Sequence, residues 1–434
     1  MRITLVGTGY VGLVSGVMLS HVGHNVICLD VDKNKVKMLQ DKKAPIFEPG
    51  LNEYIEKYAN TECLHFVYGY DDSIKDSQCV FITVGTPPKS DGDADLSGIF
   101  SAVREVCKYV NQDCIIVIKS TVPPGTCSAI QAFIISNGYQ NPVVSNPEFL
   151  REGCAINDFL KPDRIVVGAE SRESLDIMRM VYAPIINDGV AIVETDLTTS
   201  ELIKYASNTF LANKIAFINE MADLCEIVGA DIKTLARGVG LDKRIGESFL
   251  KAGPGFGGSC FPKDILALQK LAQKVDSDFL VLDAVIKANS NRPNAMIKKI
   301  ISAVGGTIAG KKIAVLGLTY KAGTDDLRNS PAVELINKLQ EFDALIVAYD
   351  PEGMPNVPKY FEKLECANSM IEAIEGADAI IIATEWEEFK AMDLVKVKDL
   401  LKTPIIIDLR NILESTDLEI NGFKYYSVGK KSGN

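Results

Sequence analysis

The sequence predicts an α/β protein in which two Rossmann-like, doubly wound parallel-sheet domains are joined by a central helical domain with one long helix. In the first part of the chain, short β-branched runs alternate with helix-length stretches. The same alternation restarts at residues 311–317, "KKIAVLG". Residues 196–228, between the two, contain almost no helix breaker. We therefore expect domains at residues 1–195, 196–305 and 306–434.

The expected strands are apolar on both faces, as parallel strands covered by helices must be. In the first domain they are "RITLVG" (2–7), "NVICLD" (25–30), "CVFITVG" (79–85), "CIIVIKS" (114–120) and "PVVSNPE" (142–148). In the last domain they are "KKIAVLG" (311–317), "DALIVAYD" (343–350), "ADAIIIAT" (377–384) and "TPIIIDL" (403–409). Between these domains, a helix capped by Thr195 or Asp196 and ended by Gly229 would be about 50 Å long and could pair with its copy in a second subunit.

The composition is that of a globular protein that binds small molecules. The chain has 434 residues, 47% of them hydrophobic, and a net charge of −11, which argues against nucleic acid and anionic membranes as partners. No basic leader precedes the first apolar run and no stretch of eighteen apolar residues occurs, so we expect a cytoplasmic protein. The ten cysteines lack CxxC or CxxH spacing, which indicates neither disulfides nor a zinc or other metal site.

The first expected strand runs into "GTGYVG", residues 7–12. Gly7 permits a tight turn, Gly9 lets a pyrophosphate approach the backbone at a helix N-terminus, and Gly12 allows close packing on the sheet. Asp30 ends the next strand, where a carboxylate binds ribose hydroxyls and repels a 2′-phosphate. The pattern predicts NAD as the cofactor, with Lys35 near its adenosine half.

Two segments follow strand ends, where open α/β sheets bind their ligands: "STVPPGT" (120–126) and "NPEFLREG" (146–153). Lys204 and Asn208 are four residues apart and share one face of the long helix. Taken alone, such a pair is more often a solvated polar stripe than a site.

The glycine-rich segment "GPGFGGSC" (253–260) ends on Cys260 and runs into "FPKD". Pro262 is suited to the first turn of a helix. The positive end of that helix and Lys263 would favour a thiolate at Cys260. A reactive cysteine is therefore the prediction, and an inert buried one the alternative.

Seven motifs in order resemble the UDP-glucose 6-dehydrogenase family, within the wider UDP-glucose/GDP-mannose dehydrogenases. They are "GTGYVG", "FEPGL", "TVPPGT", "NPEFLREG", the Lys204 helix, "GPGFGGSCFPKD" and "GLTYKAGTDDLRNSP". The resemblance covers nearly the whole chain. It implies two nucleotide-binding domains around a dimerising helix, and oxidation of the sugar alcohol of UDP-glucose to a carboxylate by two NAD, with Cys260 as nucleophile.

The resemblance also assigns catalytic roles. Cys260 would form a thiohemiacetal and then a thioester, because an aldehyde releases a second hydride only after a nucleophile adds to it. Lys204 and Asn208 would stabilise the alkoxide and later oxyanions. Asp264 would take part in the first proton removal, a base role that Lys204 could share. Glu148 would activate the hydrolytic water, and Thr121 would hold that water or the nicotinamide amide.

The remaining binding residues come from the same resemblance. The cofactor set is Gly7, Gly9, Tyr10, Val11, Gly12, Asp30, Lys35, Thr86, Thr121, Glu152, Lys263 and Arg328. The substrate set is Glu148, Phe149, Leu150, Arg151, Glu152, Lys204, Asn208, Arg244, Phe249, Lys251, Gly253, Gly257 and Lys321. Arg244 would reach a neighbouring subunit's substrate. The last domain keeps only Gly317 of a dinucleotide fingerprint, so it would hold the UDP end rather than a second NAD.

Two alternatives stay open. One is a sibling specificity, for GDP-mannose or a UDP-N-acetyl sugar. The other is an NAD-sensing binding protein without catalysis, against which the presence of Cys260, Lys204, Asn208 and Asp264 argues.

Overall fold

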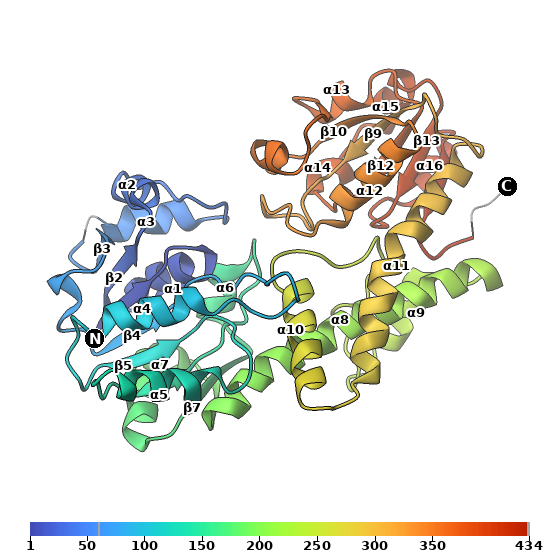
Figure 1. Ribbon diagram of the computed structural model, residues 1–434. Coiled ribbons are helices and arrows are strands. Elements are labelled where there is room, and N and C mark those ends of the chain that lie inside the picture. The colour runs from blue at the N-terminus through green and yellow to red at the C-terminus, as the bar shows by residue number, and fades with distance from the viewer. Residues whose placement is uncertain (60, 432–434) are drawn as a thin grey trace. The chain divides into compact units, whose positions relative to one another are not determined.

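The computed structural model describes residues 1–59 and 61–431 (Figure 1). The chain forms two compact units, one of residues 1–207 and 266–275 and the other of residues 208–265 and 276–434. Each contains one sheet. The division into three domains at residues 195 and 305 stays a prediction.

The first unit is built on an eight-stranded sheet with the order β3-β2-β1-β4-β5-β6-β7-β8. Its strands are β1 (Arg2–Val6), β2 (Asn25–Asp30), β3 (Leu64–Tyr68), β4 (Cys79–Ile82), β5 (Ile115–Ile118), β6 (Val143–Ser145), β7 (Arg164–Ala169) and β8 (Ala191–Thr195). Its helices are α1 (Tyr10–His21), α2 (Lys33–Gln40), α3 (Leu51–Ala59), the 3₁₀ helix η1 (Asp72–Ile74), α4 (Ser97–Val106), α5 (Thr126–Ser136), α6 (Ala155–Leu160) and α7 (Arg172–Asn187). One pairing departs from the parallel arrangement, since β6 and β7 are antiparallel.

Helices cover both faces of this sheet. Alternate side chains of β1 point to opposite faces, so Ile3 and Leu5 pack with α1 in one core, while Val6 packs with α4 and α5 in another. This double burial explains why the strands are apolar throughout. It confirms the predicted doubly wound architecture.

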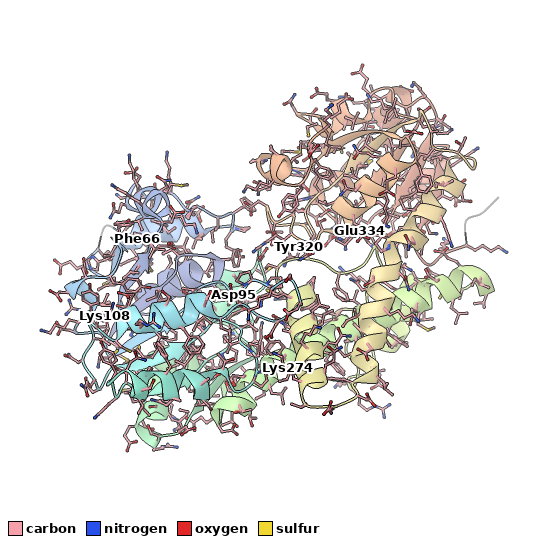
Figure 2. All side chains as sticks on the ribbon, in the orientation of Figure 1. Phe66, Asp95, Lys108, Lys274, Tyr320 and Glu334 are labelled. Carbon is pink, nitrogen blue, oxygen red and sulfur yellow. The ribbon has the colours of Figure 1, made fainter. Side chains whose placement is uncertain are left out.

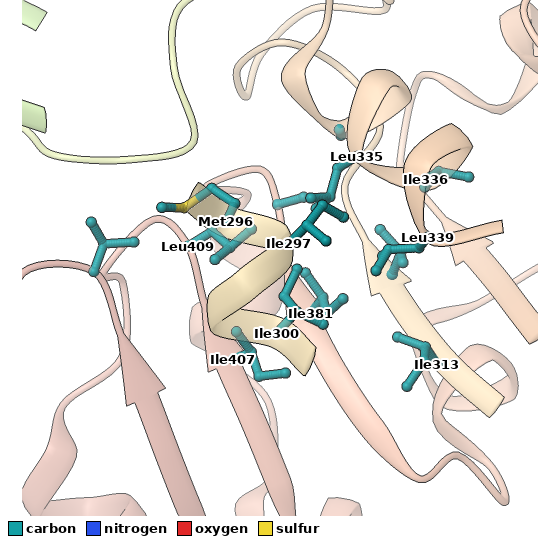
Figure 3. Packing of buried hydrophobic residues seen from close by; sticks show 14 of the residues in the cluster. Met296, Ile297, Ile300, Ile313, Leu335, Ile336, Leu339, Ile381, Ile407 and Leu409 are labelled. Atoms are coloured by element: carbon teal, nitrogen blue, oxygen red, sulfur yellow. The ribbon is translucent and has the colours of Figure 1, made fainter. Parts of the chain in front are cut away.

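The second unit holds a six-stranded sheet with the order β11-β10-β9-β12-β13-β14, and all its pairs are parallel. Its strands are β9 (Lys312–Leu316), β10 (Leu345–Tyr349), β11 (Glu365–Cys366), β12 (Ala379–Ile382), β13 (Ile405–Asp408) and β14 (Lys424–Ser427). Its helices are α9 (Ile232–Gly240), α11 (Leu280–Ala303), α12 (Pro331–Glu341), the 3₁₀ helix η2 (Met354–Lys359), α13 (Met370–Ile374), α14 (Glu387–Lys390), α15 (Leu394–Leu400) and α16 (Ser415–Ile420). Figure 3 shows one face of its core, where Ile297 and Ile300 of α11 lie near Ile381 of β12.

Two helices belong partly to each unit, α8 (Leu197–Val228) and α10 (Phe261–Lys274). Helix α8 has 32 residues, and its bounds confirm the predicted long helix. Asp196 accepts a hydrogen bond from the Thr199 N–H at 2.8 Å, and Gly229 follows the helix with φ of 78°. No helix within residues 1–59 and 61–431 is both long and apolar enough to cross a membrane.

Candidate active site

The glycine turn after β1 has the geometry expected of a dinucleotide-binding loop. Gly7 has φ of 101°, and its N–H donates to the Leu29 carbonyl at 2.8 Å. A Cβ on Gly12 would lie 1.9 Å from the Gly7 carbonyl oxygen, so a side chain there is excluded. Helix α1 begins at Tyr10, and Gly9 caps it without a side-chain hydrogen bond. The first N–H groups of α1 are therefore suited to a pyrophosphate.

Asp30 lies at the end of the neighbouring strand β2, as the sequence predicts. Its carboxylate accepts hydrogen bonds from the Thr8 N–H at 2.6 Å, the Thr8 hydroxyl at 2.7 Å and the Asp32 N–H at 2.9 Å. Burial acts to raise the pKa of Asp30, but these hydrogen bonds and the charge of Lys35 hold it below its ordinary value. The group is therefore a fixed anion beside the turn, and these residues fit NAD.

Two of the predicted cofactor-binding residues, Thr86 and Thr121, are neighbours. The Thr86 hydroxyl donates to the Thr121 carbonyl at 3.0 Å. The Glu201 carboxylate on α8 accepts hydrogen bonds from the Gly125 and Cys127 N–H groups, both at 2.6 Å. These bonds hold the "TVPPGT" segment at the start of α5.

A buried ion pair joins α8 to the segment after β6. Lys204 Nζ lies 3.3 Å from Glu148 Oε1, and each side chain is about 5% exposed. The Phe149 ring lies beside them, with Arg164 at 3.6 Å and Lys204 at 5.1 Å from its centroid. The structure thus brings three predicted substrate residues, Glu148, Phe149 and Lys204, together in the first unit.

The other predicted residues of that segment have separate surroundings. The Arg151 guanidinium donates to both Asp158 oxygens, at 2.9 and 2.6 Å. The Gly153 N–H donates to the Tyr10 hydroxyl at 2.8 Å and to Glu48 at 2.6 Å. The Tyr10 hydroxyl also donates to Glu48, so Glu48 of "FEPGL" links α1 to the loop that follows "NPEFL".

The second unit contains the other half of the predicted catalytic set. Asn208 Nδ2 donates to Asp264 Oδ2 at 2.6 Å, and Lys263 Nζ lies 2.6 Å from Asp264 Oδ1. Asp264 is buried, and its N–H donates to the Cys260 carbonyl at 3.0 Å. Cys260 directly precedes α10 and is partly exposed, with Ser259 Oγ 3.6 Å from its sulfur. A cysteine at a helix N-terminus beside a lysine is in surroundings that favour a thiolate.

Packing requires glycine at two positions before Cys260, Gly257 and Gly258, in addition to the chemistry of the site. A Cβ on Gly257 would lie 2.0 Å from the Asn329 carbonyl oxygen, and one on Gly258 would lie 2.9 Å from the Tyr320 ring (Tyr320 is labelled in Figure 2). The Gly258 N–H donates to the Arg328 carbonyl at 2.9 Å. The loop therefore needs glycine in order to pack on residues 320–331.

Other predicted residues of the second unit lie around this loop or on its surface. The Gly253 N–H donates to Asn219 Oδ1 at 2.8 Å, and the Phe249 and Phe261 rings are 6.1 Å apart. Lys321 Nζ lies 5.6 Å from the Tyr320 ring centroid. Arg244 and Arg328 pair with nearby carboxylates, those of Asp242 and Asp326. Lys251 is exposed.

Sequence reasoning missed a buried polar network at the end of β5. Lys119 Nζ donates to Asn146 Oδ1 at 3.1 Å and to the Tyr182 hydroxyl at 3.3 Å. The available signal was that Lys119 directly follows the strand run "IIVI", next to Ser120 and Thr121. Among residues 1–59 and 61–431, no three His, Cys, Asp or Glu side chains cluster as metal ligands.

Comparison with known proteins gives matches along the chain. Residues 1–186, 198–291 and 314–415 match the NAD binding, central and UDP binding domains of the UDP-glucose/GDP-mannose dehydrogenase family. A UDP-glucose 6-dehydrogenase of Rickettsia bellii is 54% identical over 99% of this chain and 100% of its own.

Solved structures agree. A UDP-glucose dehydrogenase from the archaeon Pyrobaculum islandicum superposes with a TM-score of 0.91 at 33% identity, covering 99% of this chain and 98% of its own. A UDP-D-ManNAc dehydrogenase from Pyrococcus horikoshii gives 0.87 at 28% identity over 99% of both chains. From the turn at Gly7 to the cysteine before α10, sequence, geometry and relatives agree that the chain belongs to the UDP-glucose/GDP-mannose dehydrogenase family.

Proposed function

We propose that the protein oxidises UDP-glucose to UDP-glucuronate with two NAD and one water. The position of Cys260, at the start of a helix and next to the Asn208–Asp264 pair, carries this proposal. An alcohol dehydrogenase that stops at the aldehyde needs no nucleophile, whereas oxidation to the acid does. The family and the names of the relatives support UDP-glucose as the substrate.

The first oxidation removes a proton from the 6-hydroxyl and a hydride from its carbon. The Gly7–Gly12 turn and Asp30 would hold NAD, which would supply the hydride acceptor. Lys204 and Asn208 lie one helical turn apart on α8, so both present polar groups to the same side. They stabilise the alkoxide, and Asp264 and Lys204 act as a coupled set in taking up the proton.

The second oxidation needs the cysteine. The Cys260 thiolate adds to the aldehyde carbon and forms a thiohemiacetal, which loses the second hydride to become a thioester. Water, deprotonated by Glu148 and held near Thr121, attacks the thioester carbonyl, and the carbon–sulfur bond breaks. The acid leaves and the thiolate is restored.

The binding roles divide between the two units. Phe149, Leu150, Arg151 and Glu152 belong to the sugar side, and Phe249, Lys251, Gly253, Gly257 and Lys321 to the nucleotide side. Tyr10, Val11, Lys35, Thr86, Lys263 and Arg328 belong to the cofactor site. The proposal keeps the three predicted domains: residues 1–195 for the cofactor, 196–305 for the central helices and 306–434 for the UDP end of the substrate.

A homodimer through α8 is part of the proposal. Phe210, Phe217 and Leu224 are 65%, 49% and 48% exposed and recur every seven residues along this helix. An apolar stripe of this kind is typical of a helix that packs against a partner. Arg244 then serves the neighbouring subunit's substrate. We expect the enzyme to act in the reducing cytoplasm, because all ten cysteines, Cys260 included, are free thiols.

The test is NADH absorbance after the addition of UDP-glucose, GDP-mannose or a UDP-N-acetyl sugar, each in limiting amount. We expect two NADH for each UDP-glucose and little from the others. One NADH per sugar would contradict the covalent route. Preference for another sugar would shift the specificity to a sibling reaction, and no NADH from any sugar would leave a binding protein.

A further inference from the structure

The glycine-rich loop before Cys260 is buried from residue 252 to residue 258, although these residues form no helix or strand. Loops of this kind are uncommon, because a buried peptide group needs the hydrogen-bond partner that a helix or sheet would supply. At two residues of the loop the partners are side chains of two helices, Asn219 on α8 and Asn289 and Arg292 on α11. The proposed mechanism gives these three side chains no role.

The three side chains bind both backbone groups of Gly253 and of Phe256. The Gly253 N–H donates to Asn219 Oδ1 at 2.8 Å, and Arg292 Nε donates to the Gly253 carbonyl at 2.9 Å. The Phe256 N–H donates to Asn289 Oδ1 at 2.9 Å, and Asn289 Nδ2 donates to the Phe256 carbonyl at 3.1 Å. One amide side chain therefore pairs with Phe256 as a neighbouring strand would.

The loop also packs closely on α11 between these two residues. Gly255 has φ of 119°, and a Cβ there would lie 3.0 Å from Asn289 Oδ1. Glycine at this position therefore permits the close approach. Arg292 is 4% exposed, and its Nη1 donates to Asp223 Oδ1 at 2.5 Å, which joins α11 to α8 (Figure 1). The support under the loop is thus itself held in place.

The segment held in this way is next to the reactive cysteine. Phe256 precedes Cys260 by four residues, and Cys260 directly precedes α10. The next fixed point is Gly258, whose N–H donates to the Arg328 carbonyl at 2.9 Å. The backbone that leads to the cysteine is therefore held from α11 on one side and from residue 328 on the other.

We propose that Asn289, together with Arg292 and Asn219, is a positioning residue for the second oxidation, because it fixes the loop from which the Cys260 sulfur reaches the aldehyde carbon. The inference rests on the proposed function. In that oxidation the aldehyde becomes the acid, NAD takes up the hydride and water supplies the second oxygen. Displacement of an attacking group by about 1 Å can cost a hundredfold in rate, so the position of the sulfur matters.

The reverse of the first oxidation supplies a readout that does not need the cysteine. Reduction of the aldehyde intermediate by NADH involves no thiolate. Asp264, which serves that step, is one turn inside α10 and accepts from Asn208 of α8 at 2.6 Å, so α11 does not hold it directly. A smaller folded fraction lowers both rates in proportion. The ratio of kcat for aldehyde oxidation to kcat for aldehyde reduction therefore separates positioning of Cys260 from a general loss of structure.

The experiment measures this ratio in Asn289→Ala, Asn289→Asp and Asn291→Ala. The alanine removes both hydrogen bonds to Phe256, and the aspartate keeps an acceptor for its N–H but has no donor for its carbonyl. Asn291→Ala is the matched control, because Asn291 is exposed on the same helix. We expect the ratio to fall in both Asn289 variants, by about tenfold or more in Asn289→Ala, and to stay within about twofold in Asn291→Ala.

Two results would overturn the inference: an unchanged ratio in Asn289→Ala, or an equal fall in Asn291→Ala. Should Asn289→Ala fail to fold, Asn289→Asp and the control decide. The unmodified protein is measured in the same series with UDP-glucose and with the aldehyde. If it forms no UDP-glucuronate from either, the proposed function fails; if it does and the ratio does not move, only the inference on Asn289 fails.

Discussion

The two sheets place an aspartate at the same point and use it differently. Gly7 and Gly317 end β1 and β9 with φ of 101° and 98°, and their N–H groups donate to Leu29 and Tyr349, each at 2.8 Å. Asp30 is the last residue of β2, and Asp350 directly follows β10. The strand order around them is also the same.

The surroundings of the two aspartates differ. Asp30 accepts from Thr8 and Asp32, and α1 begins three residues after Gly7. Asp350 is fully buried and accepts six hydrogen bonds, which come from Leu318 N, Thr319 N and Oγ1, Glu352 N, Gly353 N and Trp386 Nε1. Helix α12 begins only at Pro331, after Ser330. The second turn therefore lacks a helix N-terminus for a pyrophosphate, and its acid is structural.

The largest expected difference between the two is in stability. Asp350→Ala leaves several buried N–H groups without an acceptor, so we expect it to lower the free energy of unfolding by about 3–5 kcal/mol. Asp30→Ala should cost less than half as much, because fewer donors lose their partner. Urea unfolding of both variants measures this. Equal losses would mean that the two acids have the same role.

The next difference is in cofactor choice. Asp30→Ala should narrow the preference for NAD over NADP by about tenfold or more, since it removes the repulsion of a 2′-phosphate and a charged acceptor for ribose. Asp32→Ala is the matched control, because Asp32 caps α2 through the Asn34 and Lys35 N–H groups. Steady-state kinetics with both cofactors give the ratio. A preference that is unchanged in Asp30→Ala, or changed equally in Asp32→Ala, contradicts the assignment.

The smallest expected effect is in the pH dependence of unfolding. Asp408 at the end of β13 has a pKa raised by burial, against the hydrogen bonds from Leu413, Arg410, Tyr425 and Ile412. The native protein therefore binds the extra proton, and Asp408 lowers stability as the pH rises from its ordinary pKa of 3.8 through the raised value.

Asp30 acts in the opposite sense. Because the native pKa of Asp30 is lowered, its contribution to stability is present above pH 3.8, and it is lost as the pH falls through the native pKa. We expect Asp408→Asn to remove the fall in stability that Asp408 contributes above pH 3.8, and Asp30→Asn to remove the rise in stability that Asp30 contributes below that pH. Thermal unfolding across pH 2.5–6 would show this, and a change in the same window for both variants would refute it.

Local patterns in the sequence were sufficient to predict most of the fold. The apolar runs gave the central strands, and the absence of breakers gave α8 within one residue of its N-terminal end. The predicted strands did not include β3, β7, β8, β11 or β14. Four of these, β3, β8, β11 and β14, form the sheet edges, where residues are less completely buried, but β7 is buried except for its first residue. The sequence also could not show that β6 and β7 pair antiparallel, since pairing direction depends on partners far away in the chain.

The site was predicted in its chemistry but not in all its contacts. Motifs identified Cys260, Asp264 and Lys204, whereas the Lys119–Tyr182 contact joins residues 63 positions apart. A lysine at a strand end is usually solvated, and only the packing of α7 over the sheet shows that Lys119 is buried. The roles of the site residues stay predictions until they are tested.

The covalent role of Cys260 is tested most directly with the Cys260→Ser variant and the aldehyde intermediate, UDP-aldehydo-glucose. An unactivated hydroxyl is almost wholly protonated at neutral pH, so the variant should bind NAD and UDP-glucose but lose overall turnover. Because Lys204, Asn208 and Asp264 remain, it should still reduce the aldehyde to UDP-glucose with NADH, yet form no UDP-glucuronate from the aldehyde and NAD. Oxidation of the aldehyde by Cys260→Ser at a rate near that of the unmodified protein would contradict the thioester route.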